Sequence, residues 1–131
     1  MRKRPARVLV IESDEDDAAL IDSYLAGGPS SEDDLHVAHA PRLSSACHLI
    51  ESQGFDAVLL DLALPQTVGL DGFHKIRAIR PSMPVIILTG KKDEQLAARA
   101  VKLGAQDYFI KGSPDCLLLK RAVRYALEKK L

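Results

Sequence analysis

Short apolar runs alternate along the chain with segments of helical periodicity. Three of the runs, at 8–11, 57–60 and 85–88, are continuous and rich in valine, leucine and isoleucine. Continuous runs of this length are typical of strands that are buried on both faces of a parallel sheet. The more polar runs at 35–40 and 107–110 predict the outer strands of the same sheet.

Between the strands, apolar residues recur at the i, i+3 and i+4 spacing of amphipathic helices. The five stripes begin at Ala18, Leu43, Phe73, Leu96 and Leu119. Gly104 suits the C-terminal cap of the fourth helix, whereas Gly27-Gly28-Pro29 ends the first helix and opens a polar loop to Asp34. Five strands that alternate with five helices predict an α/β fold, in which a doubly wound parallel sheet lies between two layers of helices.

Length and composition predict a single folded domain that does not bind a highly charged partner such as nucleic acid. The chain has 131 residues, so we expect a single domain over 1–131, with a flexible basic N-terminal segment at 1–6. Hydrophobic residues make up 47% and charged residues 27%, which excludes a disordered polymer. Lys plus Arg and Asp plus Glu are 18 each, and this neutral balance argues against direct binding of nucleic acid or of a membrane.

Cysteine usage and hydropathy indicate the compartment. Cys47 and Cys116 are too few for a disulfide framework, and both fall in predicted helices, where reduced thiols are expected. No apolar run reaches the length of a membrane span, and no signal-peptide core follows the basic start. We therefore expect a soluble, cytoplasmic protein.

Polar side chains follow four of the predicted strands. Glu12-Ser13-Asp14 follow the first strand, Asp61 the third, Thr89-Gly90 the fourth and Lys111-Gly112 the fifth. Each has an ordinary explanation alone, since Ser13 or Asp14 is a good helix N-cap and a single lysine is commonly a surface residue. Because ligands bind outside the carboxyl ends of the strands in an open α/β sheet, their coincidence predicts a functional site at that edge.

Acids, a hydroxyl and an amine at one edge suit the transfer of a phosphoryl group to a carboxylate. Asp61 can accept the group as an acyl phosphate. A Mg²⁺ ion held by carboxylates would offset the charge of the transferred group. Lys111 would pair with one phosphate oxygen as a point charge, and the Thr89 hydroxyl would donate to another and so sense the modification.

The same residues lie in stretches that match a known family. VLVIESD at 8–14, FDAVLLDLALP at 55–65, PVIILTG at 84–90 and GAQDYFIKG at 104–112 agree with it in order and spacing. Over nearly its whole length the chain resembles a response-regulator receiver domain of two-component signalling. The resemblance implies a flavodoxin-like fold with strand order 2-1-3-4-5, and phosphotransfer from a histidine of a sensor kinase or phosphotransfer protein. It also implies Asp61 as acceptor, Thr89 as switch hydroxyl, Lys111 as phosphate partner and Tyr108 as switch aromatic.

The resemblance further implies a Mg²⁺ site made by Glu12, Asp61 and the backbone carbonyl of Ala63. Receivers of this kind usually carry two acids after the first strand, but Ser13 stands where the second is expected. A neutral hydroxyl is a poorer ligand for a hard cation, so we expect weaker metal binding, for which Asp14 could compensate. Two hypotheses stay open: the domain is phosphorylated with weakly bound Mg²⁺, or it is a receiver-like interaction module with little or no phosphorylation.

The signal would leave through the face formed by the fourth helix, the fifth strand and the fifth helix. If Thr89 is drawn toward the phosphoryl group, Tyr108 can turn inward into the space that opens. We expect this face to bind a downstream protein or a second copy of the chain. The domain would not be an enzyme beyond its own phosphotransfer and dephosphorylation. The ending at Leu131 leaves open whether the chain is complete or part of a longer regulator.

Two other classes share the fold or the chemistry. A flavodoxin-like flavin or nucleotide binder would need a glycine- or hydroxyl-rich loop after the first strand, but five acids between Glu12 and Asp17 would repel a phosphate there. A haloacid-dehalogenase-like phosphatase also uses an aspartate, placed after the first strand. The spacing of Thr89 and Lys111 fits a receiver better.

Overall fold

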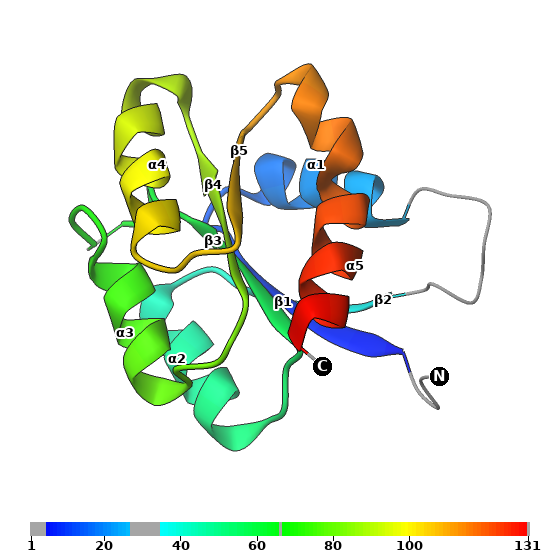
Figure 1. Cartoon of the computed structure of the whole chain (residues 1–131), viewed down its shortest axis with the longest axis vertical. Helices are drawn as coiled ribbons and strands as arrows, with labels where there is room; N and C mark the ends of the chain where they lie inside the picture. Colours follow the sequence, from blue (N-terminus) through cyan, green and yellow to red (C-terminus); the bar gives the residue numbers. More distant parts are fainter. Residues whose placement is uncertain (1–4, 27–34, 66, 131) are drawn as a thin grey trace.

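The described part of the chain forms a five-stranded parallel sheet between two layers of helices (Figure 1). The computed structural model describes residues 5–26, 35–65 and 67–130. The strands are β1 (Ala6–Ile11), β2 (Leu35–Ala40), β3 (Ala57–Asp61), β4 (Val85–Thr89) and β5 (Asp107–Ile110). Their order across the sheet is β2-β1-β3-β4-β5, which confirms the predicted fold class and strand order.

Five α-helices cover this sheet, in the places that the apolar stripes predicted. They are α1 (Glu15–Ala26), α2 (Leu43–Ser52), α3 (Asp71–Ile79), α4 (Glu94–Lys102) and α5 (Leu119–Lys130). Two short 3-10 helices, η2 (Lys91–Asp93) and η3 (Pro114–Leu118), precede α4 and α5. The helices α1 and α5 lie on one face of the sheet, and α2, α3 and α4 cover the other (Figure 1). None of the described helices is both long and apolar enough to cross a bilayer.

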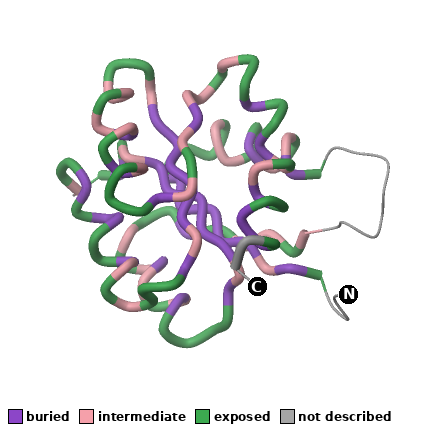
Figure 2. Tube along the Cα trace, viewed as in Figure 1, coloured by how far each residue is buried: buried purple, intermediate pink, exposed green. Residues whose placement is uncertain are grey.

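Alternate residues of the central strands belong to two separate cores. On β1, Val8 and Val10 pack with residues of α1 and α5, whereas Leu9 and Ile11 pack with residues of α2, α3 and α4. All four are fully buried, as is most of the sheet (Figure 2). A strand that is buried on both faces is apolar at every position, which explains why the run is continuous in the sequence.

The sheet begins earlier than the sequence suggested. β1 starts at Ala6, which is buried and pairs with Leu35 of β2. The last residue of the segment 1–6, which was expected to be flexible, is therefore part of the sheet, because its methyl group packs into the core on the side of α1 and α5. Residues 1–4, and the polar loop predicted between Gly27 and Asp34, lie outside the described residues.

Two further elements differ slightly from the predicted pattern. β3 and β4 each extend by one residue, so Asp61 and Thr89 are the last residues of their strands rather than the first of the following loops. Cys47 lies in α2, as predicted, but Cys116 lies in the 3-10 helix η3 before α5. Both thiols are free.

The turn after α4 is fixed by Gly104, which has a φ of +119°. Its carbonyl oxygen accepts a hydrogen bond from Arg77 Nη1 at 2.9 Å, and the Arg77 guanidinium lies over the ring of Phe73. A Cβ atom at this position would lie 2.6 Å from Arg77 Nη1. The predicted glycine cap is confirmed, and it ties α3 to the turn that leads into β5.

Candidate functional site

The carboxyl edge of the sheet holds buried polar groups that the rest of the described core lacks. Among the described residues, the buried polar or charged side chains are Glu12 after β1, Asp61 at the end of β3 and Thr89 at the end of β4, with exposed fractions of 5%, 2% and 1%. Burial of an ionised group is costly unless the group is paired. The two buried carboxylates therefore need a partner, and the segment after β5 supplies one.

Lys111, the first residue after β5, provides the positive charge. Its Nζ atom lies 3.2 Å from Glu12 Oε1, 3.2 Å from Asp61 Oδ2 and 2.9 Å from Asp17 Oδ2. An ammonium group has three N–H donors, so each can be directed to one carboxylate. Its backbone N–H also donates to the carbonyl of Thr89, which continues the pairing of β5 with β4 past the last strand residue.

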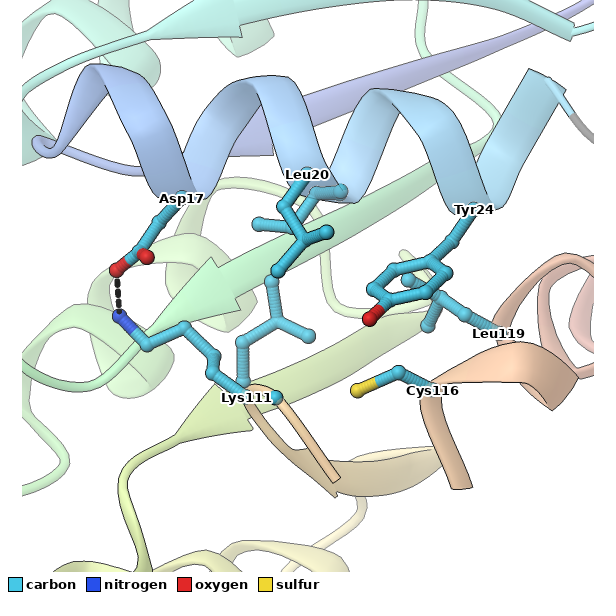
Figure 3. A pocket seen from close by; sticks show the side chains of 9 residues that line it. Asp17, Leu20, Tyr24, Lys111, Cys116 and Leu119 are labelled. Carbon is cyan, nitrogen blue, oxygen red and sulfur yellow. Dashed lines mark hydrogen bonds and ion pairs between the residues drawn. The ribbon is translucent and has the colours of Figure 1, made fainter. Parts of the chain in front are cut away.

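Asp17 is a member of the site that the sequence did not reveal. It lies in the first turn of α1 and points toward Lys111 (Figure 3). Acids in the first turn of a helix are common because they interact favourably with the helix dipole, so Asp17 looks like an ordinary first-turn acid in the sequence. One signal was present: Asp17 precedes Ile21 by four residues and so shares the inward face of α1.

Asp14 and Ser13 take other places. Asp14 Oδ1 accepts the backbone N–H of Asp17 at 2.9 Å, which is the bond of a helix N-cap. The backbone N–H of Asp14 donates in turn to Glu12 Oε2 at 3.2 Å. Ser13 is exposed. The carboxylate of Asp14 thus caps the N-terminus of α1. Its predicted role as a metal ligand that compensates for Ser13 stays a prediction.

The electrostatics of the site reflect burial and the closeness of the carboxylates to one another. Burial, followed by the hydrogen bond and charge of Asp61, raises the pKa of Glu12 from its usual 4.5 to about 7, against the opposing effects of the Asp14 backbone and Lys111. For Lys111, burial disfavours the charged form, but the contacts with Asp17, Asp61 and Glu12 outweigh burial and raise its pKa above the usual value. The ammonium therefore stays charged among three acids, and the cluster retains an excess of negative charge when they are ionised.

This excess charge suits a small divalent cation. Mg²⁺ is commonly held by one or two carboxylates together with water and phosphate oxygens, and Glu12 and Asp61 are two adjacent buried carboxylates. No group of three acidic, histidine or cysteine side chains in the described ranges is arranged to hold a metal ion. The remaining ligands would be the carbonyl of Ala63, whose own N–H donates to Asp61 Oδ1 at 3.0 Å, and water. The residues present fit a Mg²⁺ ion with two protein carboxylates.

The two predicted switch residues make hydrogen bonds outside the cluster of Glu12, Asp61 and Lys111. The Thr89 hydroxyl donates to the carbonyl of Gly90 at 3.1 Å. The Tyr108 hydroxyl on β5 donates to Glu94 Oε2 on α4 at 2.7 Å. The structure therefore brings Glu12, Asp61 and Lys111 together, places Thr89 at the neighbouring strand end and connects Tyr108 to α4.

Comparisons with known proteins place the chain in a family. The family profile described as response regulator receiver domain matches residues 8–123. The chain is 34% identical over 116 residues to the transcriptional regulatory protein RstA of Escherichia coli (strain K12), which covers 87% of this chain and 45% of RstA. It is 35% identical over 99 residues to protein-glutamate methylesterase/protein-glutamine glutaminase 1 of Burkholderia pseudomallei (strain 1710b), covering 73% of this chain and 27% of that protein.

The chain thus spans less than half the length of these relatives. Among solved structures, the response regulator receiver domain protein from Clostridium thermocellum superimposes with a TM-score of 0.79 at 30% identity. That match covers 95% of this chain and 96% of the other. The solved structure agrees with the five-stranded fold, and the profile and the relatives show that the chain belongs to the response regulator receiver domain family.

Proposed function

We propose that Asp61 accepts a phosphoryl group from a histidine of a sensor kinase or phosphotransfer protein. The observation that carries the proposal is the contact between the buried Asp61 carboxylate and the Lys111 ammonium, 3.2 Å apart at the carboxyl edge of the sheet. An oxygen of Asp61 would attack the phosphorus atom while the phosphorus–nitrogen bond to the histidine breaks. An acyl phosphate forms, and the departing histidine nitrogen takes up a proton.

The surrounding residues suit this transfer because it depends mainly on positioning and on neutralisation of charge. Lys111 would direct an N–H to a phosphoryl oxygen and so hold the group in line with Asp61. Glu12, Asp61 and the Ala63 carbonyl would hold Mg²⁺, which supplies further positive charge when bound. With Ser13 in place of an acid, the protein offers this cation one carboxylate fewer.

The modification would be read out on the surface formed by α4, β5 and α5. A phosphoryl oxygen offers the Thr89 hydroxyl a charged acceptor that is stronger than the Gly90 carbonyl. Movement of Thr89 would open space for Tyr108 to leave Glu94 and turn inward. A downstream protein or a second copy of the chain would then bind the altered surface.

Intact mass measurement tests the acceptor directly. Incubation with acetyl phosphate and Mg²⁺ is expected to add the mass of one phosphoryl group to the wild-type protein and none to Asp61→Asn. Asp16→Asn removes an exposed acid of α1 and serves as the control, which should be labelled like the wild type. Equal labelling of Asp61→Asn would place the acceptor elsewhere.

A receiver-like interaction module with little phosphorylation is the second candidate. Two observations favour it: Ser13 brings no charge to the site, and Lys111 already contacts both predicted carboxylate ligands of the metal. Failure of the wild type to gain mass, under conditions that label another receiver domain, would support this candidate over phosphotransfer.

A further inference from the structure

Asp17 makes the shortest of the three contacts with Lys111. Its Oδ2 atom lies 2.9 Å from Nζ, compared with 3.2 Å for the oxygens of Glu12 and Asp61. The Asp17 side chain is 38% exposed, whereas those of Glu12 and Asp61 are 1% and 2% exposed. Lys111 is therefore held between a buried pair of carboxylates and a third carboxylate at the rim of the site.

The two buried partners of Lys111 are also the predicted carboxylate ligands of the cation. A divalent cation held by Glu12 and Asp61 would therefore compete with the ammonium group for these two carboxylates. If the cation displaced the ammonium from both, Lys111 would lose two of its three partners. Asp17 stays available because it approaches the ammonium from α1 rather than from the sheet (Figure 3).

The packing around Lys111 limits where its ammonium group can go. Its side chain lines a crevice between α1 and the start of α5, together with Leu20, Ile21 and Leu119. The crevice has a volume of about 10 Å³, which is room for about one water molecule. The crevice therefore leaves the Lys111 side chain little space to withdraw from Asp17 and Asp61 into the protein.

We propose that Asp17 is a positioning residue that holds Lys111 beside Asp61 when a divalent cation occupies the buried carboxylates. This proposal rests on the proposed function of Asp61. One N–H of Lys111 stays bonded to Asp17, and the other two are directed to the oxygens of the incoming phosphoryl group. Asp17 thereby eases entry of the cation and keeps the lysine in place for phosphotransfer, at a site where Ser13 adds no carboxylate.

The proposal predicts the effect of Asp17→Asn on metal binding. Without the carboxylate, the ammonium depends more on Glu12 and Asp61 and competes more strongly with the cation. We expect Asp17→Asn to weaken Mn²⁺ binding about two- to fivefold, the range for a partly exposed ion pair. Free Mn²⁺, counted by its electron paramagnetic resonance signal, gives the dissociation constant without any phosphorylation step. Asp17→Glu keeps the charge and should restore most of the affinity.

A double-mutant cycle with Lys111→Ala separates action through the lysine from a simple charge effect. Lys111→Ala removes the competing ammonium and should tighten Mn²⁺ binding. In that background, Asp17→Asn should reduce the Mn²⁺ affinity no more than Asp16→Asn does. Asp16→Asn removes an exposed acid from the same turn. If Asp17→Asn reduced the Mn²⁺ affinity equally in both backgrounds, the proposal would be overturned, because Asp17 would then act directly on the cation. An unchanged Mn²⁺ affinity of Asp17→Asn in the wild-type background would overturn it as well.

A second measurement distinguishes failure of this inference from failure of the proposed function. At saturating Mg²⁺, acetyl phosphate should label Asp17→Asn more slowly than the wild type, and Asp17→Glu should recover the rate. If the wild type takes up no phosphoryl group at all, the proposed function of Asp61 is wrong. The double-mutant cycle measured by Mn²⁺ binding still decides whether Asp17 positions Lys111.

Discussion

At the residue scale, Ser13 is the position where we expect the site to offer a cation less negative charge. It lies beside the buried Glu12, is exposed, and carries no charge of its own. We expect Ser13→Asp to raise the Mg²⁺ affinity and the rate of acetyl phosphate labelling about tenfold, because a further carboxylate would face the ion at short range. Labelling measured over a range of Mg²⁺ concentrations gives both quantities.

Ser13→Ala is the control for this substitution, since it changes the side chain but adds no charge. It should leave the Mg²⁺ dependence near that of the wild type. If Ser13→Asp changed neither the affinity nor the rate, the serine would not be what weakens the site, and the competition of Lys111 for Glu12 and Asp61 would become the main explanation.

Between elements, the contact from Tyr108 on β5 to Glu94 on α4 holds the surface that would carry the signal. The hydrogen bond to Glu94, followed by partial burial, raises the pKa of Tyr108 above its usual 10. We expect Glu94→Gln to lower that pKa, because the neutral amide no longer opposes formation of the phenolate. A spectrophotometric titration of tyrosinate, with Tyr108→Phe to identify the relevant step, measures the change.

Identical titrations of the wild type and Glu94→Gln would mean that the contact with Glu94 does not govern the ionisation of Tyr108.

For the whole domain, the raised pKa of Glu12 predicts how stability depends on pH. The folded state holds a proton on Glu12 up to pH about 7, whereas the unfolded chain releases it near 4.5. The contribution of Glu12 to stability is therefore fully present below pH 4.5, and it is lost as the pH rises from 4.5 to about 7. We expect the free energy of unfolding to fall by roughly 1–3 kcal/mol between pH 5 and 7.5 in metal-free buffer.

Urea unfolding at the two pH values tests this dependence. Glu12→Gln should remove most of the difference, because its amide does not ionise. Glu15→Gln changes an exposed acid of α1 and should keep the wild-type dependence. A wild-type protein that is equally stable at both pH values would show that Glu12 ionises alike in the folded and unfolded states.

Much of the fold could be predicted because it depends on local patterns. Continuous apolar runs identified the buried strands, and the polar residues after them converge because parallel strands all end at one edge. The contact between Asp17 and Lys111 could not be predicted in this way. It joins residues 94 positions apart and depends on how α1 packs beside the segment after β5. The capping bond of Asp14 was foreseen only as one of two possibilities, since Ser13 is an equally good cap.

The arrangement around Lys111 also means that the protein carries its own substitute for a bound cation. The Lys111 ammonium is part of a side chain and cannot diffuse away. Glu12 and Asp61 therefore have a positive neighbour even when no divalent cation is present. A dissolved ion has to displace part of this built-in charge, and its concentration decides how often that happens. If Asp61 accepts a phosphoryl group as proposed, the domain would stay folded when divalent ions are scarce and would become receptive to that group as their level rises.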